Sequence, residues 1–229
     1  MRHPTLLIRD KMTEAIAKNE LAKMFAGGAM KVREAHSYLS QLASVAGDGD
    51  HGTTMLRVVK CMEEAVHHDS SNNLSTLLRD TGWSVMGVGV DGGASSALLG
   101  TFLKGMGDVT IDENSMDCRD LANAFEVGLR AVAKISPAQP GDKTMMDALC
   151  PAVSAFRAAA AGGKNVEQAM EDAATATQTE ADSTKNFAAR FGRAKFLKEK
   201  TLGCPDAGAV SIALLFSGFS SGLAQERKS

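Results

Sequence analysis

Apolar residues recur along this chain at steps of three and four, the period that places side chains on one face of an α-helix. Residues 32–46 show it, with apolar side chains at 32, 35, 39, 42 and 46. The pattern predicts further helices over 12–24, 53–66, 74–86, 95–106, 121–132, 146–156, 166–176 and 209–219. Alternation of period two is nearly absent, and Val88-Gly89-Val90 is the only strand-like stretch. The fold class predicted is all-α, a bundle of about eight helices.

Short segments rich in Gly, Asn and Asp separate these helices. We expect connectors at Gly27-Gly28, at 69–73, at 107–114 and at Gly162-Gly163. No repeat, low-complexity tract or proline-rich hinge divides the 229 residues, so we expect a single domain over 1–229. Residues 1–27 are expected to form an N-terminal helical extension, and about 28–224 the core.

Composition narrows the classes of function. The net charge of −2 and a pI near 6.2 argue against nucleic-acid binding, which requires a basic surface. Four separated cysteines form no C-x-x-C pair, which favours a reducing compartment, the cytoplasm. The N-terminal apolar stretch is too short for a signal peptide. No stretch is expected to reach the ~18 apolar residues of a membrane span.

The most informative segment is Gly47-Asp48-Gly49-Asp50-His51-Gly52-Thr53-Thr54, directly before a predicted helix. Paired carboxylates suit Mg²⁺ or Ca²⁺, and a helix N-terminus offers N–H groups and a positive dipole end to phosphate. The competing interpretation is an ordinary turn, where Asp and Gly are common. Neither an EF-hand nor a Walker A spacing is present.

Three further segments have phosphate-binding character. They are Asp91-Gly92-Gly93-Ala94-Ser95-Ser96, Pro140-Gly141-Asp142-Lys143-Thr144-Met145, and 192–209, which contains Gly192-Arg193-Ala194 and Asp206-Ala207-Gly208-Ala209. Alone, the first is equally explained as a capped helix start. The second is explained by Asp142 as the N-cap of a helix, and the third as a solvated run of cations.

Taken in order, these four motifs resemble the nucleotide-binding subunit of dihydroxyacetone kinases, DhaL. The resemblance runs from about residue 38 to the last helix. It implies an antiparallel eight-helix barrel that binds ADP or ATP with two Mg²⁺ ions in loops at one open end. It further implies a cytoplasmic phosphotransferase that is active only with a substrate-binding DhaK-like subunit, because the half that holds the ketose is not in this sequence. The phosphoryl donor is left open between ATP and a phosphotransferase-system phosphocarrier protein.

Carried over position by position, the resemblance implies metal ligation and catalysis by Asp48 and Asp50, with Arg193 as a further catalytic residue. It implies nucleotide contacts by residues of all four motifs, namely His51, Gly52, Thr53, Thr54, Ala94, Ser95, Met145, Arg193, Asp206 and Gly208.

The chain departs from the family pattern at two positions. Ala207 replaces a proline, and Ala43 stands where the family has a third metal-binding carboxylate. Loss of that carboxylate should weaken both Mg²⁺ ions. Asp91 is either a partial replacement or a solvated turn residue. Two rival functions therefore remain, a degenerate paralogue that regulates by binding nucleotide, and a metal-dependent phosphate-ester hydrolase.

Overall fold

The computed structural model describes residues 13–45, 47, 49–71, 73–88, 93–109 and 114–224, and eight long helices make up most of this described part. They are α1 (Lys18–Ser44), α2 (His51–His68), α3 (Leu74–Gly87), α4 (Gly93–Gly107), α5 (Cys118–Ile135), α6 (Met146–Ala161), α7 (Val166–Ser183) and α8 (Ala207–Ala224). Three short 3₁₀ turns connect α7 to α8: η1 (Thr184–Asn186), η2 (Arg193–Phe196) and η3 (Lys198–Thr201).

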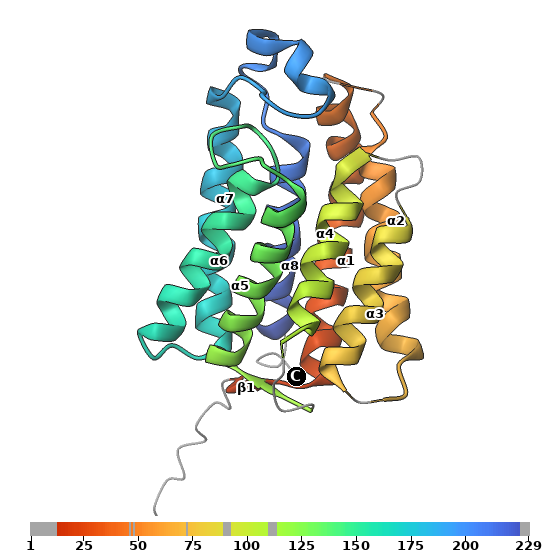
Figure 1. Ribbon diagram of the computed structural model, residues 1–229, viewed down its shortest axis with the longest axis vertical. Helices are drawn as coiled ribbons and strands as arrows, with labels where there is room; N and C mark the ends of the chain where they lie inside the picture. Colours follow the sequence, from red (N-terminus) through yellow and green to blue (C-terminus); the bar gives the residue numbers. More distant parts are fainter. Residues whose placement is uncertain are drawn as a thin grey trace, which may run out of the picture.

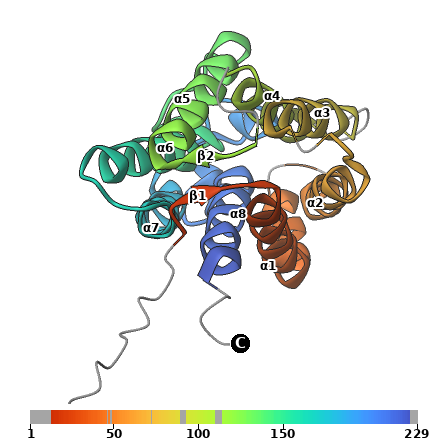
Figure 2. The same cartoon turned by 90° about the horizontal axis from the view of Figure 1, so that it is seen from below.

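Each helix packs against the next, and α8 packs against both α7 and α1, so the helices close into a ring (Figure 2). Their short connections make successive helices antiparallel. The odd-numbered helices therefore begin at one end of the ring and the even-numbered helices at the other (Figure 1). The predicted all-α, eight-helix barrel is confirmed. That the chain is a single domain with an extension over 1–27 stays a prediction.

Two short strands were not predicted. β1 (Ala15–Ile16) pairs antiparallel with β2 (Met116–Asp117), with Ala15 opposite Asp117 and Ile16 opposite Met116. They lie where α1 and α5 begin (Figure 2). In the strand-like stretch 88–90, Val88 is in a turn and the other two residues lie outside the described part.

The predicted connector at Gly27-Gly28 is wrong, since both glycines lie inside the continuous helix α1. Their role is close packing against α8. A Cβ on Gly27 would lie 2.1 Å from the carbonyl oxygen of Gly218, and a Cβ on Gly222 would lie 2.2 Å from that of Lys23. The missing side chains bring two helix backbones together, so glycine here marks a contact and not a break.

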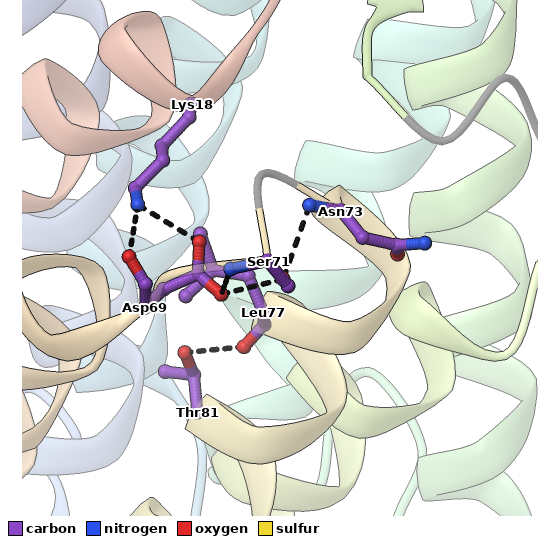
Figure 3. Close-up of polar contacts among 6 residues, drawn as sticks. All are labelled: Lys18, Asp69, Ser71, Asn73, Leu77 and Thr81. Carbon is purple, nitrogen blue, oxygen red and sulfur yellow. Dashed lines mark hydrogen bonds and ion pairs between the residues drawn. The ribbon is translucent and has the colours of Figure 1, made fainter.

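At the end of the ring with the strands, side chains cap three helices, and a partly buried ion pair joins α1 to the α2–α3 connection (Figure 3). The Asn73, Asp117 and Asn165 side chains cap α3, α5 and α7. Lys18 Nζ, at the start of α1, lies 2.8 Å from Asp69 Oδ2 in the α2–α3 connection. Burial alone would raise the pKa of Asp69, but hydrogen bonds from Lys18 and Ser71 outweigh it and lower the pKa to about 2.

Helix α8 corrects the expectation that no segment approaches the length of a membrane span. Its 18 residues have a mean hydropathy of 1.6, enough by length and composition. In the structure 61% of this window is buried. α8 lies between α1 and α7, and its Phe216 ring packs 5.7 Å from Phe125 in the core. Packing inside the ring accounts for its apolar composition.

Candidate nucleotide site

All four even-numbered helices begin beside one cavity of about 580 Å³ at the end of the ring opposite the strands. Each contributes a residue of its first turn to the wall, namely His51 of α2, Ala94 of α4, Met146 of α6 and Ala207 of α8. The opposite wall comes from the α7–α8 connection, through Phe191, Gly192, Ala194, Lys195 and Phe196. This connection covers the upper end of the ring in Figure 1.

The structure brings most of the predicted site residues to this cavity. The predicted residues in its wall are Asp50, His51, Ala94, Ser95, Met145, Asp206 and Gly208. Asp48 lies outside the described residues. The Arg193 backbone begins η2 between two wall residues, Gly192 and Ala194. Ala43, the position of the missing carboxylate, is also in the wall.

Gly52, Thr53 and Thr54 lie in the first turn of α2 but do not line the cavity. Gly52 faces α1, because a Cβ there would lie 2.0 Å from the carbonyl oxygen of His36. This glycine sets the α1–α2 spacing. Nucleotide contact by these three residues stays a prediction; the backbone N–H groups of Gly52 and Thr53 suit that role best, because the Thr54 N–H already donates to the Asp50 carbonyl oxygen.

His51 is a buried imidazole with an unsatisfied nitrogen. The residue is 8% exposed, and within the described part of the chain Nε2 has no hydrogen-bond partner. Burial lowers the pKa of His51 from 6.5 to about 4, and a backbone hydrogen bond with Ala207 only partly opposes that shift. The ring is therefore neutral at pH 7. A buried nitrogen without a partner requires an explanation, and a ligand in the adjoining cavity provides one.

Asp206 caps α8 at the cavity. Its Oδ2 accepts a hydrogen bond of 2.8 Å from the Ala209 N–H. Burial raises the pKa of Asp206 to about 6; Asp147 adds to the rise, while Lys143 and the backbone N–H groups oppose it. Helix α2 differs, since the side chain of its N-cap Asp50 makes no capping hydrogen bond. The N-terminus of α2 is thus open to an anion.

Sequence reasoning missed the buried polar framework of the α5–α6 connection. Asp147 accepts hydrogen bonds from Gly141 N (2.6 Å) and Thr144 N (2.7 Å) and holds the connection in a tight turn. The prediction of Asp142 as a helix N-cap is wrong, because α6 has Met145 at that position. Asp142 instead accepts from Gln139 N at 2.8 Å, inside the turn.

Lys143, a residue of the same motif, is 5% exposed and lines the cavity. Its Nζ donates to the carbonyl oxygens of Thr184 (2.7 Å) and Cys204 (2.5 Å). The sequence clue to a structural role for Lys143 was its position directly after Gly141-Asp142 in a turn. In the structure its φ is 61°, a conformation rare for residues other than glycine, and its tertiary contacts stabilise it.

The carboxylates at the cavity suit a metal ion that binds as part of a metal–nucleotide complex. Within the described residues, no three His, Cys, Asp or Glu side chains form a group able to hold a metal ion. Asp50 is at the cavity, and Ala43 offers no oxygen where a further carboxylate was expected. Mg²⁺ keeps waters and substrate phosphates as ligands, so one or two carboxylates are sufficient for a metal–nucleotide complex.

Comparison with known proteins agrees with this geometry. The family model described as the DAK2 domain matches residues 45–221. The L-erythrulose kinase of Pectobacterium atrosepticum is 35% identical over 186 residues, covering 80% of this chain and 31% of that protein. The ADP-binding subunit DhaL of the PEP-dependent dihydroxyacetone kinase of Escherichia coli is 33% identical over 178 residues, covering 78% and 84%. The chain thus spans about a third of the erythrulose kinase and most of the DhaL subunit.

A solved structure supports the same fold. The dihydroxyacetone kinase of C. freundii in complex with AMP-PNP and Mg²⁺ superposes with a TM-score of 0.67 at 24% identity, covering 96% of this chain and 37% of that one. The match to the domain model over most of the chain, together with the match to nearly the whole DhaL subunit, shows that this chain belongs to the DAK2-domain family, as a DhaL-like member.

Proposed function

We propose that this chain is the nucleotide-binding subunit of a dihydroxyacetone-type kinase. It holds ADP or ATP with Mg²⁺ in the cavity and transfers a phosphoryl group to a small ketose bound on a separate subunit. The observation that carries the proposal is the convergence of four helix N-termini on one cavity, with α2 left uncapped by Asp50. N-terminal N–H groups and the positive ends of helix dipoles stabilise phosphate oxygens.

The cavity wall divides into parts that suit the two ends of a nucleotide. Apolar side chains of Leu98, Met145 and Met146 offer a surface for a base. Asp50 and His51 lie at the start of α2, where phosphates would be placed. Asp50, with Asp48 beside it in sequence, would hold Mg²⁺, which when bound supplies charge that offsets the phosphate oxygens. We expect two ions, bound more weakly because Ala43 provides no ligand.

The exposed face beside the cavity suits a partner subunit that closes over the nucleotide. Arg190, Lys195, Lys198 and Lys200 are exposed on the α7–α8 connection, and the Phe196 side chain is 78% exposed. Aromatic residues are enriched at protein interfaces, and the exposed Phe196 ring, with Lys195 Nζ 5.0 Å from its centroid, suits one. We propose a DhaK-like subunit as that partner, in the cytoplasm. The names of the Escherichia coli and Listeria innocua relatives include PEP dependence, which favours a phosphocarrier protein over free ATP as donor.

A second function has one observation in its favour. Ala43 lies in the cavity wall where the family pattern has a carboxylate. A site with fewer metal ligands binds nucleotide without efficient transfer, which would suit a regulatory subunit. The same site acting on water would be a phosphate-ester hydrolase.

One assay separates the three. Purified chain is incubated with dihydroxyacetone and either Mg-ATP or Mg-ADP with a PEP-charged phosphocarrier system, alone and with a DhaK subunit, and both sugar phosphate and free phosphate are measured. Product that requires both chains supports the kinase. Free phosphate from this chain alone supports the hydrolase, and nucleotide binding without either product supports the regulatory subunit. The control is Asp50→Asn, which should weaken nucleotide binding in Mg²⁺ but leave the weak binding in excess chelator unchanged.

A further inference from the structure

The cavity wall between α7 and α8 belongs to a segment with little structure of its own. We call residues 185–203 the cap; it carries Phe191, Lys195 and Phe196 into the wall. Its elements are 3₁₀ turns of three or four residues, too short to be stable alone. Beyond the short-range bonds of these turns, a hydrogen bond of 3.1 Å from Ala189 N to Thr201 Oγ1 joins the two halves of the cap. A backbone hydrogen bond of 3.1 Å from Arg190 N to the Asp142 carbonyl oxygen ties its middle to the α5–α6 connection, and its two ends are held separately.

The two ends of the cap meet in a hydrogen-bonded neck. Gly203 N donates to the Lys185 carbonyl oxygen at 2.8 Å, and Asp206 N donates to Thr184 Oγ1 at 2.8 Å. Lys143 enters this neck from the α5–α6 connection. Its ammonium group bonds the carbonyl of Thr184 on one side and that of Cys204 on the other. One side chain thus joins three separate segments of the chain.

The chemistry of the neck favours a cation at this point. Thr184 is the C-cap of α7, where backbone carbonyls lack helical partners and the helix dipole is negative. The carboxylates of Asp206 and Asp147 also face Lys143 and stabilise its charged form against burial. The Arg190 side chain also contacts this connection, with Nη1 3.3 Å from Asp142 Oδ1, but it is 73% exposed. Exposed ion pairs contribute little.

We infer that Lys143 is a positioning residue that clamps the neck of the cap and so fixes the Phe191–Phe196 wall of the cavity. The clamp itself is a property of the protein without ligand. Its consequence for nucleotide binding rests on the proposed function.

The test compares Lys143→Met with Arg190→Met, which removes a charge from the cap without touching the neck. Hydrogen exchange is followed at the amides of Ala189 and Gly203, with α6 amides as reference. Lys143→Met leaves the Cys204 carbonyl without its Lys143 donor and the Thr184 carbonyl with only the Phe187 N–H, so cap amides should exchange roughly tenfold to a hundredfold faster while α6 is unchanged. Arg190→Met should change them less than about threefold. Equal acceleration in all helices, or none in the cap, would overturn the clamp.

Nucleotide affinity in Mg²⁺ tests the consequence. Lys143→Met should weaken it at least about tenfold, and Arg190→Met much less. Faster cap exchange with unchanged affinity would refute the positioning role. Wild-type protein that binds no nucleotide would refute the proposed function, and the exchange experiment would still decide on the clamp. If Lys143→Met does not fold, ¹⁵N spectra of the wild-type lysine ammonium groups replace it. A slowly exchanging Lys143 ammonium supports the clamp, and averaging with solvent-exposed lysines contradicts it.

Discussion

Acidification from pH 7 to pH 5 should change the free energy of unfolding through two buried groups of the cavity, His51 and Asp206, in opposite directions. His51 has its pKa lowered to about 4, so in this range the unfolded chain binds a proton that the folded chain does not. Stability therefore falls as pH falls through 6.5. Asp206 has its pKa raised to about 6, so the folded chain binds a proton first and stability rises as pH falls through 6. The two linkages have opposite signs in one pH window.

Their magnitudes follow from these pKa values. Between pH 7 and pH 5, His51 alone should remove ~2 kcal/mol from the free energy of unfolding, and Asp206 alone should add ~1 kcal/mol. The wild-type protein should thus lose only about 1 kcal/mol from this pair. In His51→Gln the free energy of unfolding should rise between pH 7 and pH 5, because only the Asp206 contribution remains. In Asp206→Asn, which keeps an acceptor for the Ala209 N–H, it should fall by the full ~2 kcal/mol of His51.

Urea denaturation at pH 7 and pH 5, in chelator and without nucleotide, measures the difference for each variant. His68→Gln is the control, because His68 is exposed at the end of α2. The difference between the two pH values is compared, so a general loss of stability in a variant cancels. Equal pH dependence of wild type and His51→Gln would refute the burial argument for His51. Equal dependence of wild type and Asp206→Asn would refute it for Asp206.

Three other predictions are independent of this pair. Gly27→Ala should destabilise the protein by about 1–3 kcal/mol in urea titration, because its Cβ would meet the α8 backbone, while Gly87→Ala, facing open space, should be nearly neutral. The contribution of Asp69, about 2 kcal/mol, should be present above pH 4 and lost towards pH 2, as acid titration of wild type and Asp69→Asn will show. Arg193→Ala should weaken Mg-nucleotide binding in calorimetry roughly tenfold to a hundredfold with an unchanged thermal transition; the reverse pattern would make Arg193 structural.

Helix number and order were predictable because amphipathic periodicity is a local property. Seven of the nine predicted helices were found as separate helices, with ends at most seven residues from the predicted limits, and the helices predicted over 12–24 and 32–46 are one helix, α1. The error at Gly27 and Gly28 has a definite cause. Glycine at the end of a helix and glycine between two touching helices look alike in one sequence, and the partner, Gly218, lies almost two hundred residues away. Only tertiary contact distinguishes the two roles.

The buried polar groups of the site were harder to predict for a related reason. Lys143, Asp142 and Asp147 have the composition of a solvated helix start, and their spacing is compatible with one. Burial gives them different roles: Asp147 organises the turn, and Lys143 joins the ends of the cap. Lys143 is buried because it contacts Thr184 and Cys204, which are distant in sequence, and no local sequence pattern predicts these contacts.

The candidate site was nevertheless predictable as a set, and the topology explains why. In an up-and-down ring, every second connection lies at the same end. The four motifs fall in the connections before α2, α4, α6 and α8, so antiparallel packing alone brings together segments separated by 40 to 60 residues. The capped helices α3, α5 and α7 begin at the other end, where Asn73, Asp117 and Asn165 satisfy their own N–H groups. Three helices at one end of the ring are thus capped by the side chains of their own N-cap residues, whereas the Asp50 side chain does not cap α2 at the other end.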